Sequence, residues 1–267
     1  MRAALPAMRE AVAASGLSVA EIATLETPDA SRRIAAVTLA EEPEGFAPGA
    51  LAAALAGVFE GVRVKGPSGG VLARHGPARL TMAVAGRSFE VSVDTFFQVN
   101  RHLSPVLYAD ARGEAASIAP GLALDAFGGA GFFAGALLDA GHRVVSVEGS
   151  ETASEDAGRN RRAWAATDSW RIAASSVDRY LGASEDTFDL VVADPPRAGL
   201  GLRLAAELAT RAGRRLIYVS CDPATLARDL PVILREGFAV TSAWGYDLFL
   251  FTHRVEAMIV LDRKKAS

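Results

Sequence analysis

The spacing of apolar and polar positions changes near residue 94. Before that point, short apolar runs alternate with glycine-bearing turns, which is typical of strands and hairpins. Strands are predicted at 33–39, 62–65, 71–74, 80–85 and 88–93. Helical spacing covers 5–14, Pro48 opens a helix that runs to about residue 59, and Ser18 with Glu21 forms a capping box that predicts another helix start. We therefore expect residues 1–93 to form a smaller α+β accessory domain with several antiparallel strand pairs.

From residue 94 to residue 267, nearly unbroken apolar strands alternate with helices. The predicted strands are 122–127, 143–148, 171–174, 188–193 and 214–220, and the predicted helices are 101–118, 132–140, 151–165, 177–181, 202–211 and 224–235. This alternation is typical of a parallel sheet with helices on both faces. Segments 239–244 and 255–261 would add a final antiparallel pair. We predict that residues 94–267 form a doubly wound α/β domain with a mostly parallel seven-stranded sheet.

Composition excludes several classes of protein. The 267 residues carry a formal charge of −3 with a pI near 5.9, so RNA or DNA binding would need a local basic patch. The single cysteine, Cys221, excludes an internal disulfide framework and any multi-cysteine metal or iron–sulfur site. No apolar run approaches the ~20 residues of a membrane span, and the first residues do not form a signal-peptide core. We expect a soluble, cytoplasmic protein that binds no metal and no membrane.

The first strand of the predicted α/β domain runs into a glycine loop. The sequence Gly128-Gly129-Ala130-Gly131 precedes a helix, and Gly129-x-Gly131-x-x-Ala134 matches the G-x-G-x-x-A dinucleotide fingerprint. Glu148 ends the second strand, at about the offset where an acid binds a ribose hydroxyl. The loop therefore predicts an adenosine-containing ligand. A dehydrogenase, a methyltransferase and a plain tight turn with a surface acid all remain compatible with it.

Two further strand ends carry candidate chemistry. Asp194-Pro195-Pro196-Arg197 follows the fourth strand, where a rigid turn would present the Asp194 carboxylate to a ligand or simply cap the turn. Cys221 follows the fifth strand, with Asp222 as a helix cap and Pro223 opening the helix. A helix amino terminus favours a thiolate, although a lone cysteine is commonly a small buried apolar residue.

These motifs together resemble those of the RNA 5-methyluridine methyltransferases. They occur in the family's order over residues 94 to about 261, and the stretch that contains Cys221 is the most specific of them. The motifs are Asp94-Thr95-Phe96-Phe97-Gln98-Val99-Asn100, the glycine loop, Asp194-Pro195-Pro196-Arg197, Ser220-Cys221-Asp222-Pro223-Ala224-Thr225-Leu226-Ala227-Arg228-Asp229 and Phe251-Thr252-His253-Arg254-Val255-Glu256.

The resemblance implies a Rossmann-like class I methyltransferase domain that uses S-adenosylmethionine. In that family a thiolate adds to carbon 6 of uracil, so that carbon 5 can attack the methyl group, and a base then removes the proton from carbon 5. By resemblance, Cys221 is the nucleophile and Glu256 is the base. The residues implied to contact the cofactor are Gln98, Phe127, Gly129, Gly131, Glu148 and Asp194. Phe96 is expected to stack on a base, and Asp194 also to contact the uracil of an RNA that presents the uridine flipped or unpaired.

The chain departs from the family pattern at several positions. Phe132 stands where the family commonly has Asn, and Asp222 replaces an Asn after the nucleophile, where a carboxylate disfavours the thiolate. Leu250 and Arg254 replace Pro and His near Glu256, and Arg254 would either lower the basicity of Glu256 or contact phosphate. The amino-terminal β-barrel and four-cysteine cluster of some members are not present, so we expect RNA binding to be organised differently. Candidate phosphate contacts are Arg32-Arg33, Arg159, Arg161-Arg162, Arg214-Arg215 and Lys264-Lys265.

The leading hypothesis is an S-adenosylmethionine-dependent enzyme that makes 5-methyluridine in rRNA or tRNA through a covalent cysteine adduct. The departures keep a second hypothesis open, an RNA-binding or remodelling module with weak or lost catalysis. A methyltransferase with a non-uridine substrate is a third, because Asp-Pro-Pro-Arg is reminiscent of the Asn/Asp-Pro-Pro-aromatic motif of amino-group methyltransferases.

Overall fold

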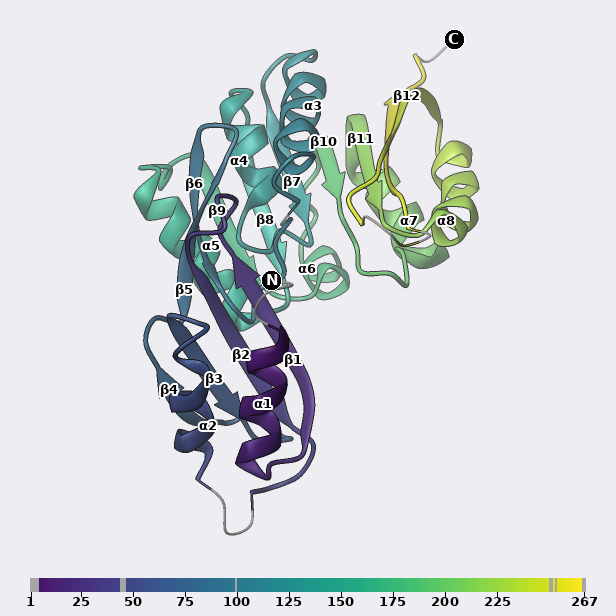
Figure 1. Cartoon of the computed structure of the whole chain (residues 1–267). Coiled ribbons are helices and arrows are strands. Elements are labelled where there is room, and N and C mark those ends of the chain that lie inside the picture. Colours follow the sequence, from purple (N-terminus) through teal and green to yellow (C-terminus); the bar gives the residue numbers. More distant parts are fainter. Residues whose placement is uncertain (1–4, 44–46, 99, 250–251, 253, 266–267) are drawn as a thin grey trace. The chain divides into compact units, whose positions relative to one another are not determined.

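The computed structural model describes residues 5–43, 47–98, 100–249, 252 and 254–265 (Figure 1). The chain separates into two compact units. Unit 1 contains Met1–Ala83 and Ser88–Val99, and unit 2 contains Val84–Arg87 and Asn100–Ser267. The assignment of residues 1–93 to an RNA-binding accessory domain, and of residues 94–267 to a methyltransferase domain, stays a prediction.

Unit 1 is built on a four-stranded sheet in the order β1-β2-β3-β4. Its elements are α1 (Leu5–Ser15), β1 (Val19–Glu26), β2 (Arg33–Leu39), α2 (Pro48–Leu55), β3 (Gly61–Lys65) and β4 (Val71–His75). Strands β2 and β3 pair in parallel across the α2 crossover, whereas β1–β2 and β3–β4 pair antiparallel. Apolar side chains of both helices, including Met8 and Leu51, bury one face of this sheet. Strands β5 (Arg79–Val84) and β6 (Arg87–Ser92) form a separate two-stranded sheet.

The helix that the capping box of Ser18 and Glu21 predicts is not formed, and the prediction is wrong. The segment is strand β1, which pairs with β2 from Val19–Leu39 to Glu26–Arg33. Gly16 ends α1 in the left-handed region, with φ of 65°, and the chain then runs back along β2, whose residues are largely buried. A continuous strand ladder outweighs the local capping signal, since a cap stabilises a helix by only ~1 kcal/mol.

Unit 2 contains the predicted doubly wound, mostly parallel seven-stranded sheet, which is confirmed. Its order is β12-β13-β11-β10-β7-β8-β9. The strands are β7 (Leu122–Ala126), β8 (Arg143–Glu148), β9 (Trp170–Ala174), β10 (Phe188–Ala193), β11 (Ala212–Ser220), β12 (Phe238–Tyr246) and β13 (Glu256–Arg263). Strand β13 runs antiparallel to both of its neighbours, as expected for the final pair, and the other pairings are parallel.

Helices of unit 2 cover this sheet, and the order of the strands fixes where a ligand can bind. The helices are α3 (Ser104–Ala116), α4 (Phe132–Asp139), α5 (Glu151–Ala163), α6 (Val177–Ala183), α7 (Gly201–Arg211) and α8 (Pro223–Arg235). Helices α3 and α4 pack together, as do α7 and α8 (Figure 1). The chain proceeds from β7 to β8 on one side and returns to β10 on the other, so the switch point lies at the carboxyl ends of β7 and β10. None of the helices in the described part of the chain has the length and apolar composition that a membrane crossing requires.

Candidate active site

The glycine loop leaves β7 at the switch point and turns directly into α4. Phe127, Gly129 and Gly131 all have positive φ, of 65°, 53° and 97°. Two positions of the loop also have no room for a side chain. A Cβ at Gly128 would lie 2.9 Å from the Ser146 Cβ, and a Cβ at Gly131 would lie 2.3 Å from the Trp170 ring. The loop is therefore pressed against the sheet, and the amino terminus of α4 faces the edge where a ligand of this fold binds.

Glu148 lies beside this loop, where the sequence pattern placed it. One carboxylate oxygen of Glu148 accepts a hydrogen bond from the Gly129 amide at 2.9 Å, and the other accepts one from the Ser150 amide at 2.6 Å. These two bonds fix the carboxylate at the end of β8. Its remaining lone pairs can accept hydrogen bonds from two neighbouring hydroxyl groups, such as those of a ribose.

Asp125 is a site residue that the sequence analysis did not assign. Its carboxyl is fully buried, and Oδ2 accepts hydrogen bonds from the Ala134 amide at 3.0 Å and from the Ser146 hydroxyl at 3.1 Å. The other oxygen, Oδ1, is buried without a hydrogen-bond partner. Burial raises the pKa of Asp125 to about 7, and the charge of Asp194 adds to the rise. An acid at the end of the strand before a glycine loop was the signal available in the sequence.

Asp194 follows β10, and its carboxylate is half-buried. Its amide donates to the Ala126 carbonyl at 3.4 Å, which joins the ends of the two central strands. The negative charge of Asp194 raises the pKa values of Asp125 and of Glu256. Asp194 therefore interacts electrostatically with Asp125, beside the glycine loop, and with Glu256, at the far side of this sheet edge, where β11 and β13 lie.

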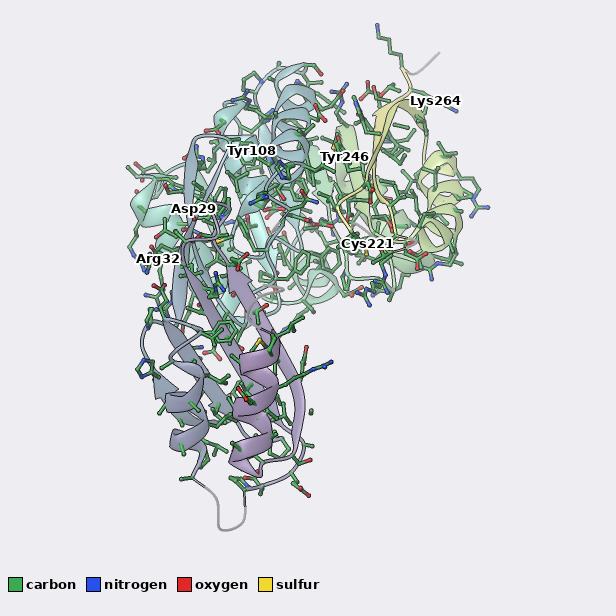
Figure 2. All side chains as sticks on the ribbon, in the orientation of Figure 1. Asp29, Arg32, Tyr108, Cys221, Tyr246 and Lys264 are labelled. Atoms are coloured by element: carbon green, nitrogen blue, oxygen red, sulfur yellow. The ribbon has the colours of Figure 1, made fainter. Side chains whose placement is uncertain are left out.

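Cys221 and Glu256 meet at that far side. Ser220, the last residue of β11, pairs with Ala257 of the antiparallel strand β13. Cys221 directly follows Ser220 and Glu256 directly precedes Ala257, so these two residues come next to each other. Figure 2 shows Cys221 where β11 passes into α8. The charges of Glu256 and Asp194 both raise the pKa of Cys221. The structure therefore brings together the three polar side chains Cys221, Glu256 and Asp194.

The Glu256 carboxyl is unusual because it is ionisable, buried and incompletely hydrogen-bonded. Its residue is 2% exposed, and Oε1 has no hydrogen-bond partner. Burial raises the pKa of Glu256 to about 8, with a further contribution from the charge of Asp194. The alternative that Glu256 is an exposed strand residue is excluded. Of the two alternative roles expected for Arg254, lowering the basicity of Glu256 finds no support, because burial and Asp194 are the causes of the shifted pKa.

Asp222 is the amino-terminal cap of α8. One oxygen of its carboxylate accepts from the Ala224 amide at 2.8 Å and from the Thr225 amide at 3.2 Å, which confirms the predicted cap. The backbone at the start of α8 lowers the pKa of Cys221, as expected of a helix amino terminus, but larger effects of the opposite sign outweigh it. Burial raises the pKa of Cys221, and Glu256 and Asp194 raise it further, against a smaller lowering by Arg197.

A buried carboxylate on α8 holds the loop that follows Asp194. Asp229 accepts hydrogen bonds from the Leu200 amide at 2.8 Å, the Gly201 amide at 3.2 Å and the Tyr218 hydroxyl at 2.9 Å. Arg228 pairs with the same carboxylate and donates to the Ala198 carbonyl at 2.8 Å. We call this set the loop clamp. The clamp explains why the motif that begins with Ser-Cys ends in Arg-Asp, which no spacing argument predicted.

Phe96 and Gln98 belong to unit 1 and are described within it. The Phe96 side chain is 71% exposed, whereas Gln98 is buried. Phe97 packs against Phe89 with ring centroids 5.2 Å apart, so of the two neighbouring aromatic residues only Phe96 is available to a partner. Asp94, which starts this segment, forms ion pairs with Arg63 at 2.9 Å and Lys65 at 2.7 Å.

Phe132, the first of the departures, is a core residue. It is buried, and its ring meets those of Tyr108 and Phe133 edge-on, with centroids 5.5 and 5.1 Å away. Leu250, Phe251 and His253 lie outside the described residues. Among the residues that the structure describes, no group of three or more acidic, His or Cys side chains is placed to hold a metal ion.

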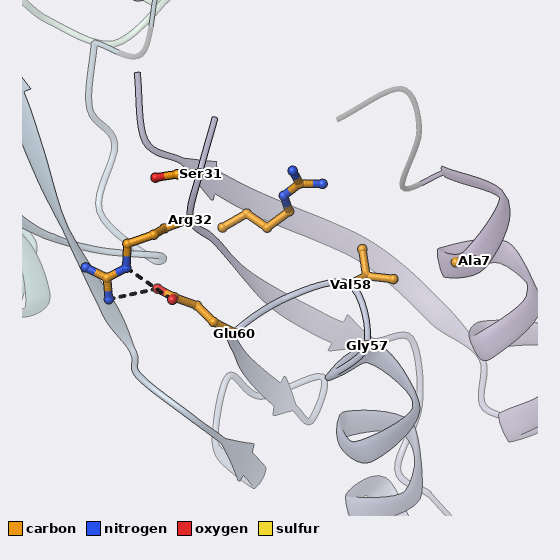
Figure 3. A pocket seen from close by; sticks show the side chains of 7 residues that line it. Ala7, Ser31, Arg32, Gly57, Val58 and Glu60 are labelled. Carbon is orange, nitrogen blue, oxygen red and sulfur yellow. Dashed lines mark hydrogen bonds and ion pairs between the residues drawn. The ribbon is translucent and has the colours of Figure 1, made fainter. Parts of the chain in front are cut away.

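Some of the candidate phosphate contacts are already paired with carboxylates. A hollow of unit 1, with a volume of about 510 Å³, is lined by Arg32 and Glu60 among others. Figure 3 shows the hydrogen bond and ion pair between these two side chains. Arg215 is nearly buried and is held by Glu114 and Asp262. The charge of each of these two arginines is therefore already paired with a carboxylate.

Comparisons with known proteins agree with this arrangement. A family model described as tRNA (uracil-5-)-methyltransferase matches residues 181–264, which include Cys221 and Glu256. An uncharacterized RNA methyltransferase of Streptomyces avermitilis is 36% identical over 205 residues, which are 75% of this chain and 47% of that protein. A 23S rRNA (uracil(747)-C(5))-methyltransferase of Vibrio vulnificus is 34% identical over 170 residues, 64% of this chain and 44% of that protein. The chain thus spans less than half the length of these relatives.

The fold is also that of solved methyltransferases. A Pyrococcus abyssi tRNA (uracil-54, C5)-methyltransferase in complex with S-adenosyl-L-homocysteine superimposes with a TM-score of 0.73 at 22% identity, over 97% of this chain and 66% of that one. A putative S-adenosylmethionine-dependent methyltransferase of Streptococcus mutans superimposes with a TM-score of 0.59 at 13% identity, over 95% of this chain and 77% of that one. The class I methyltransferase fold that the sequence predicted is confirmed.

Proposed function

Because the chain belongs to the RNA (uracil-5-)methyltransferase family, we propose that it transfers a methyl group from S-adenosylmethionine to carbon 5 of a uridine in RNA. The observation that carries this proposal is the meeting of Cys221 and Glu256 on adjacent strands, with the Glu256 carboxyl buried and one of its oxygens unpartnered. A dehydrogenase needs neither residue.

The residues around the glycine loop fit the cofactor. Gly129 and Gly131 let the backbone approach a ligand closely, Phe127 turns the chain, and Glu148 is positioned to accept hydrogen bonds from ribose hydroxyls. The buried, unpartnered Oδ1 of Asp125 is a further acceptor at this edge. S-adenosylmethionine, when bound, supplies an electrophilic methyl group. We also assign Asp194 and Gln98 to cofactor contact, as the family motifs imply.

The uracil chemistry is assigned to two side chains. The Cys221 sulfur adds to carbon 6, which makes carbon 5 nucleophilic and leaves the negative charge on the uracil as an enolate. Carbon 5 then takes the methyl group, whose bond to the sulfonium sulfur breaks and leaves S-adenosylhomocysteine. Glu256 accepts the proton from carbon 5, the C–H electron pair re-forms the double bond between carbons 5 and 6, and the bond from carbon 6 to sulfur breaks, which releases the thiolate. Asp194 lies within electrostatic reach of both residues and is the group that we assign to the uracil edge.

The raised pKa of Glu256, about 8, suits a base that must remove a carbon-bound proton, because a more basic carboxylate transfers protons more effectively. The raised pKa of Cys221 has the opposite consequence. Little thiolate is present near neutral pH, and only this thiolate fraction can attack carbon 6.

RNA is the proposed substrate, with the uridine flipped or unpaired so that it reaches the thiol. We assign base stacking to Phe96, whose ring is exposed. Asp94, two residues before it, pairs with both Arg63 and Lys65, so these three side chains together carry one excess positive charge.

Replacing Phe96 by Ala should weaken RNA binding by roughly 1–3 kcal/mol. Leu72→Ala is the matched control, because Leu72 is another exposed apolar side chain of unit 1. Equal RNA affinity of the two variants would exclude the stacking role.

The direct test is transfer of labelled methyl groups to RNA from a strain that lacks the enzyme, followed by nucleoside analysis. We expect 5-methyluridine as the product. Cys221→Ala should abolish transfer while S-adenosylhomocysteine still binds, and Glu256→Gln should accumulate a protein–RNA adduct on denaturing gels, since the bond to sulfur cannot break without loss of the proton. Glu236→Gln, on the exposed end of α8, is the control. Intact cofactor binding without any methylated uridine would refute the proposal.

A second candidate function is an RNA-binding module with weak catalysis. The raised pKa of Cys221 favours it, because a thiol that stays protonated is a poor nucleophile. Calorimetry with S-adenosylhomocysteine separates the two, because a module that has lost catalysis has no need of a cofactor site. Tight binding of that ligand would remove the support for the second candidate.

A further inference from the structure

The glycine loop rests on a tryptophan that belongs to none of the family motifs. Trp170, the first residue of β9, is 1% exposed, and its six-membered ring lies under Gly131, the residue that caps α4. A single added carbon at Gly131 would come within 2.3 Å of that ring. The position of the loop at its tightest point is therefore set by the position of the Trp170 ring.

The indole nitrogen of Trp170 starts a buried chain of hydrogen bonds that ends at the same loop. Trp170 Nε1 donates to the Ser146 hydroxyl at 2.8 Å, and that hydroxyl donates to Asp125 Oδ2 at 3.1 Å. Asp125 Oδ2 also accepts from the Ala134 amide of α4 at 3.0 Å. Since an indole can only donate and a hydroxyl has one hydrogen, Trp170 orients the Ser146 hydrogen toward Asp125.

The ring of Trp170 is itself fixed from the outer side. Trp164 stacks on it with centroids 5.2 Å apart and an interplanar angle of 14°. The Arg87 guanidinium lies 4.3 Å from the Trp164 ring centroid and pairs with Asp139, the last residue of α4. The same series of contacts thus meets α4 at both of its ends, at Gly131 and at Asp139.

We propose that Trp170 is a positioning residue for the cofactor, which acts through Ser146 on Asp125 and through its ring on Gly131. This inference rests on the proposed function, because it assumes that the glycine loop binds S-adenosylmethionine. The affected ligand is the cofactor and not RNA, since Trp170, Ser146 and Asp125 act on the glycine loop. Trp170 touches no reacting atom and is therefore expected to affect cofactor binding and not the chemical step.

The test is calorimetric titration of the full chain with S-adenosylhomocysteine. Trp170→Phe keeps most of the ring and removes the indole donor, and we expect about five- to tenfold weaker binding, the effect of one buried hydrogen bond. With saturating S-adenosylmethionine, kcat for RNA methylation should stay within about twofold of wild type while KM for the cofactor rises by the factor seen in binding. Trp244→Phe is the matched control, on the edge strand β12, and should leave both unchanged.

Ser146→Ala gives a second readout and decides the matter if Trp170→Phe does not fold. The Ser146 hydrogen bond lowers the pKa of Asp125, whereas burial and the charges of Asp194 and Glu148 raise it. Removing the hydroxyl should therefore move the midpoint of the pH dependence of S-adenosylhomocysteine affinity to higher pH. A merely structural residue would lower the melting temperature without moving this midpoint.

The outcomes separate this inference from the proposed function. Wild-type protein that does not bind S-adenosylhomocysteine overturns both. Wild-type protein that binds, with Ser146→Ala binding equally well at every pH, overturns the positioning role alone, as does a folded Trp170→Phe with unchanged affinity. Weaker binding by the folded variants with kcat retained, or an upward shift of the midpoint in Ser146→Ala, supports it.

Discussion

Replacing Glu256 by Gln should stabilise the protein and inactivate it at once. Glutamine has nearly the same shape but does not ionise, and Glu256 is 2% exposed with one oxygen unpartnered. Its pKa is raised from an ordinary 4.5 to about 8 in the folded chain. The unfolded state therefore loses its proton first as pH rises, so the wild-type carboxyl disfavours folding above pH ~4.5, increasingly up to pH ~8.

The size of this effect follows from the two pKa values. Each pKa unit corresponds to about 1.4 kcal/mol, so ionisation of Glu256 costs the folded state about 1.4 kcal/mol at pH ~5.5 and about 4.4 kcal/mol at pH ~8. Glu256→Gln escapes this cost. We expect its advantage in free energy of unfolding over wild type to grow by up to about 3 kcal/mol between those pH values, which is about 6–12 °C in melting temperature for a unit of this size.

Urea and thermal unfolding at the two pH values measure the effect. Glu236→Gln, which changes an exposed glutamate, should show no difference that depends on pH. An advantage of Glu256→Gln that is the same at both pH values would show that the carboxyl titrates normally, and the argument for a buried base would fail. The expected result means that the proposed base is held at a cost to stability, which is common at functional sites.

Three further predictions concern the rest of the site. The rate at which the Cys221 thiol reacts with iodoacetamide should rise with pH, with a midpoint above the ordinary pKa of a thiol. Glu256→Gln should lower the pH of that midpoint, because the negative charge of Glu256 raises the pKa of Cys221. A midpoint at higher pH in the variant would contradict the geometry. Asp229→Ala should leave two loop amides unpaired and destabilise the fold by about 3 kcal/mol. The variant should lose more of its methyl transfer activity than of its affinity for S-adenosylhomocysteine. If only that affinity falls, the loop clamp serves another site. Gly131→Ala should weaken S-adenosylhomocysteine binding at least about tenfold, because the added Cβ clashes with the Trp170 ring and φ at this position is positive. Gly182→Ala should leave the affinity unchanged, since nothing lies near a Cβ there. Equal affinities of the two variants would refute the packing argument.

The architecture of unit 2 was predictable because each of its signals is local and repeated. Strands such as 143–148 and 188–193 are rich in apolar residues, and the structure keeps their predicted bounds unchanged. Unit 1 was harder. Its strands are short, β2 and β3 pair in parallel although antiparallel pairs were expected, and a good capping box at Ser18 lies in a strand. Where a signal at one residue competes with a ladder of several hydrogen bonds, the ladder decides.

The supporting residues of the site could not be predicted from spacing. Trp170 and Ser146 lie on two neighbouring strands, and their hydrogen bond depends on the register of β8 with β9, which the sequence does not specify. Asp229 acts on a loop about thirty residues earlier, through the packing of α7 against α8. Burial was equally hidden, and with it the raised pKa values of Asp125 and Glu256. Desolvation depends on what packs around a group, and no motif records that.

The position of Glu256, in contrast, follows from the topology. The ligand-binding edge of this sheet is formed by the carboxyl ends of its parallel strands, so a residue at the start of a parallel strand lies at the opposite edge. Glu256 is the first residue of β13, and it reaches the ligand edge only because β13 runs antiparallel between β11 and β12. The same reversal sets Ala257 opposite Ser220, so that the Glu256 carboxyl and the Cys221 thiol lie at the same edge of the sheet, close enough to interact electrostatically. The proposed nucleophile and the proposed base come from segments that are distant in the sequence, and this one reversed strand brings them to the same edge of the sheet.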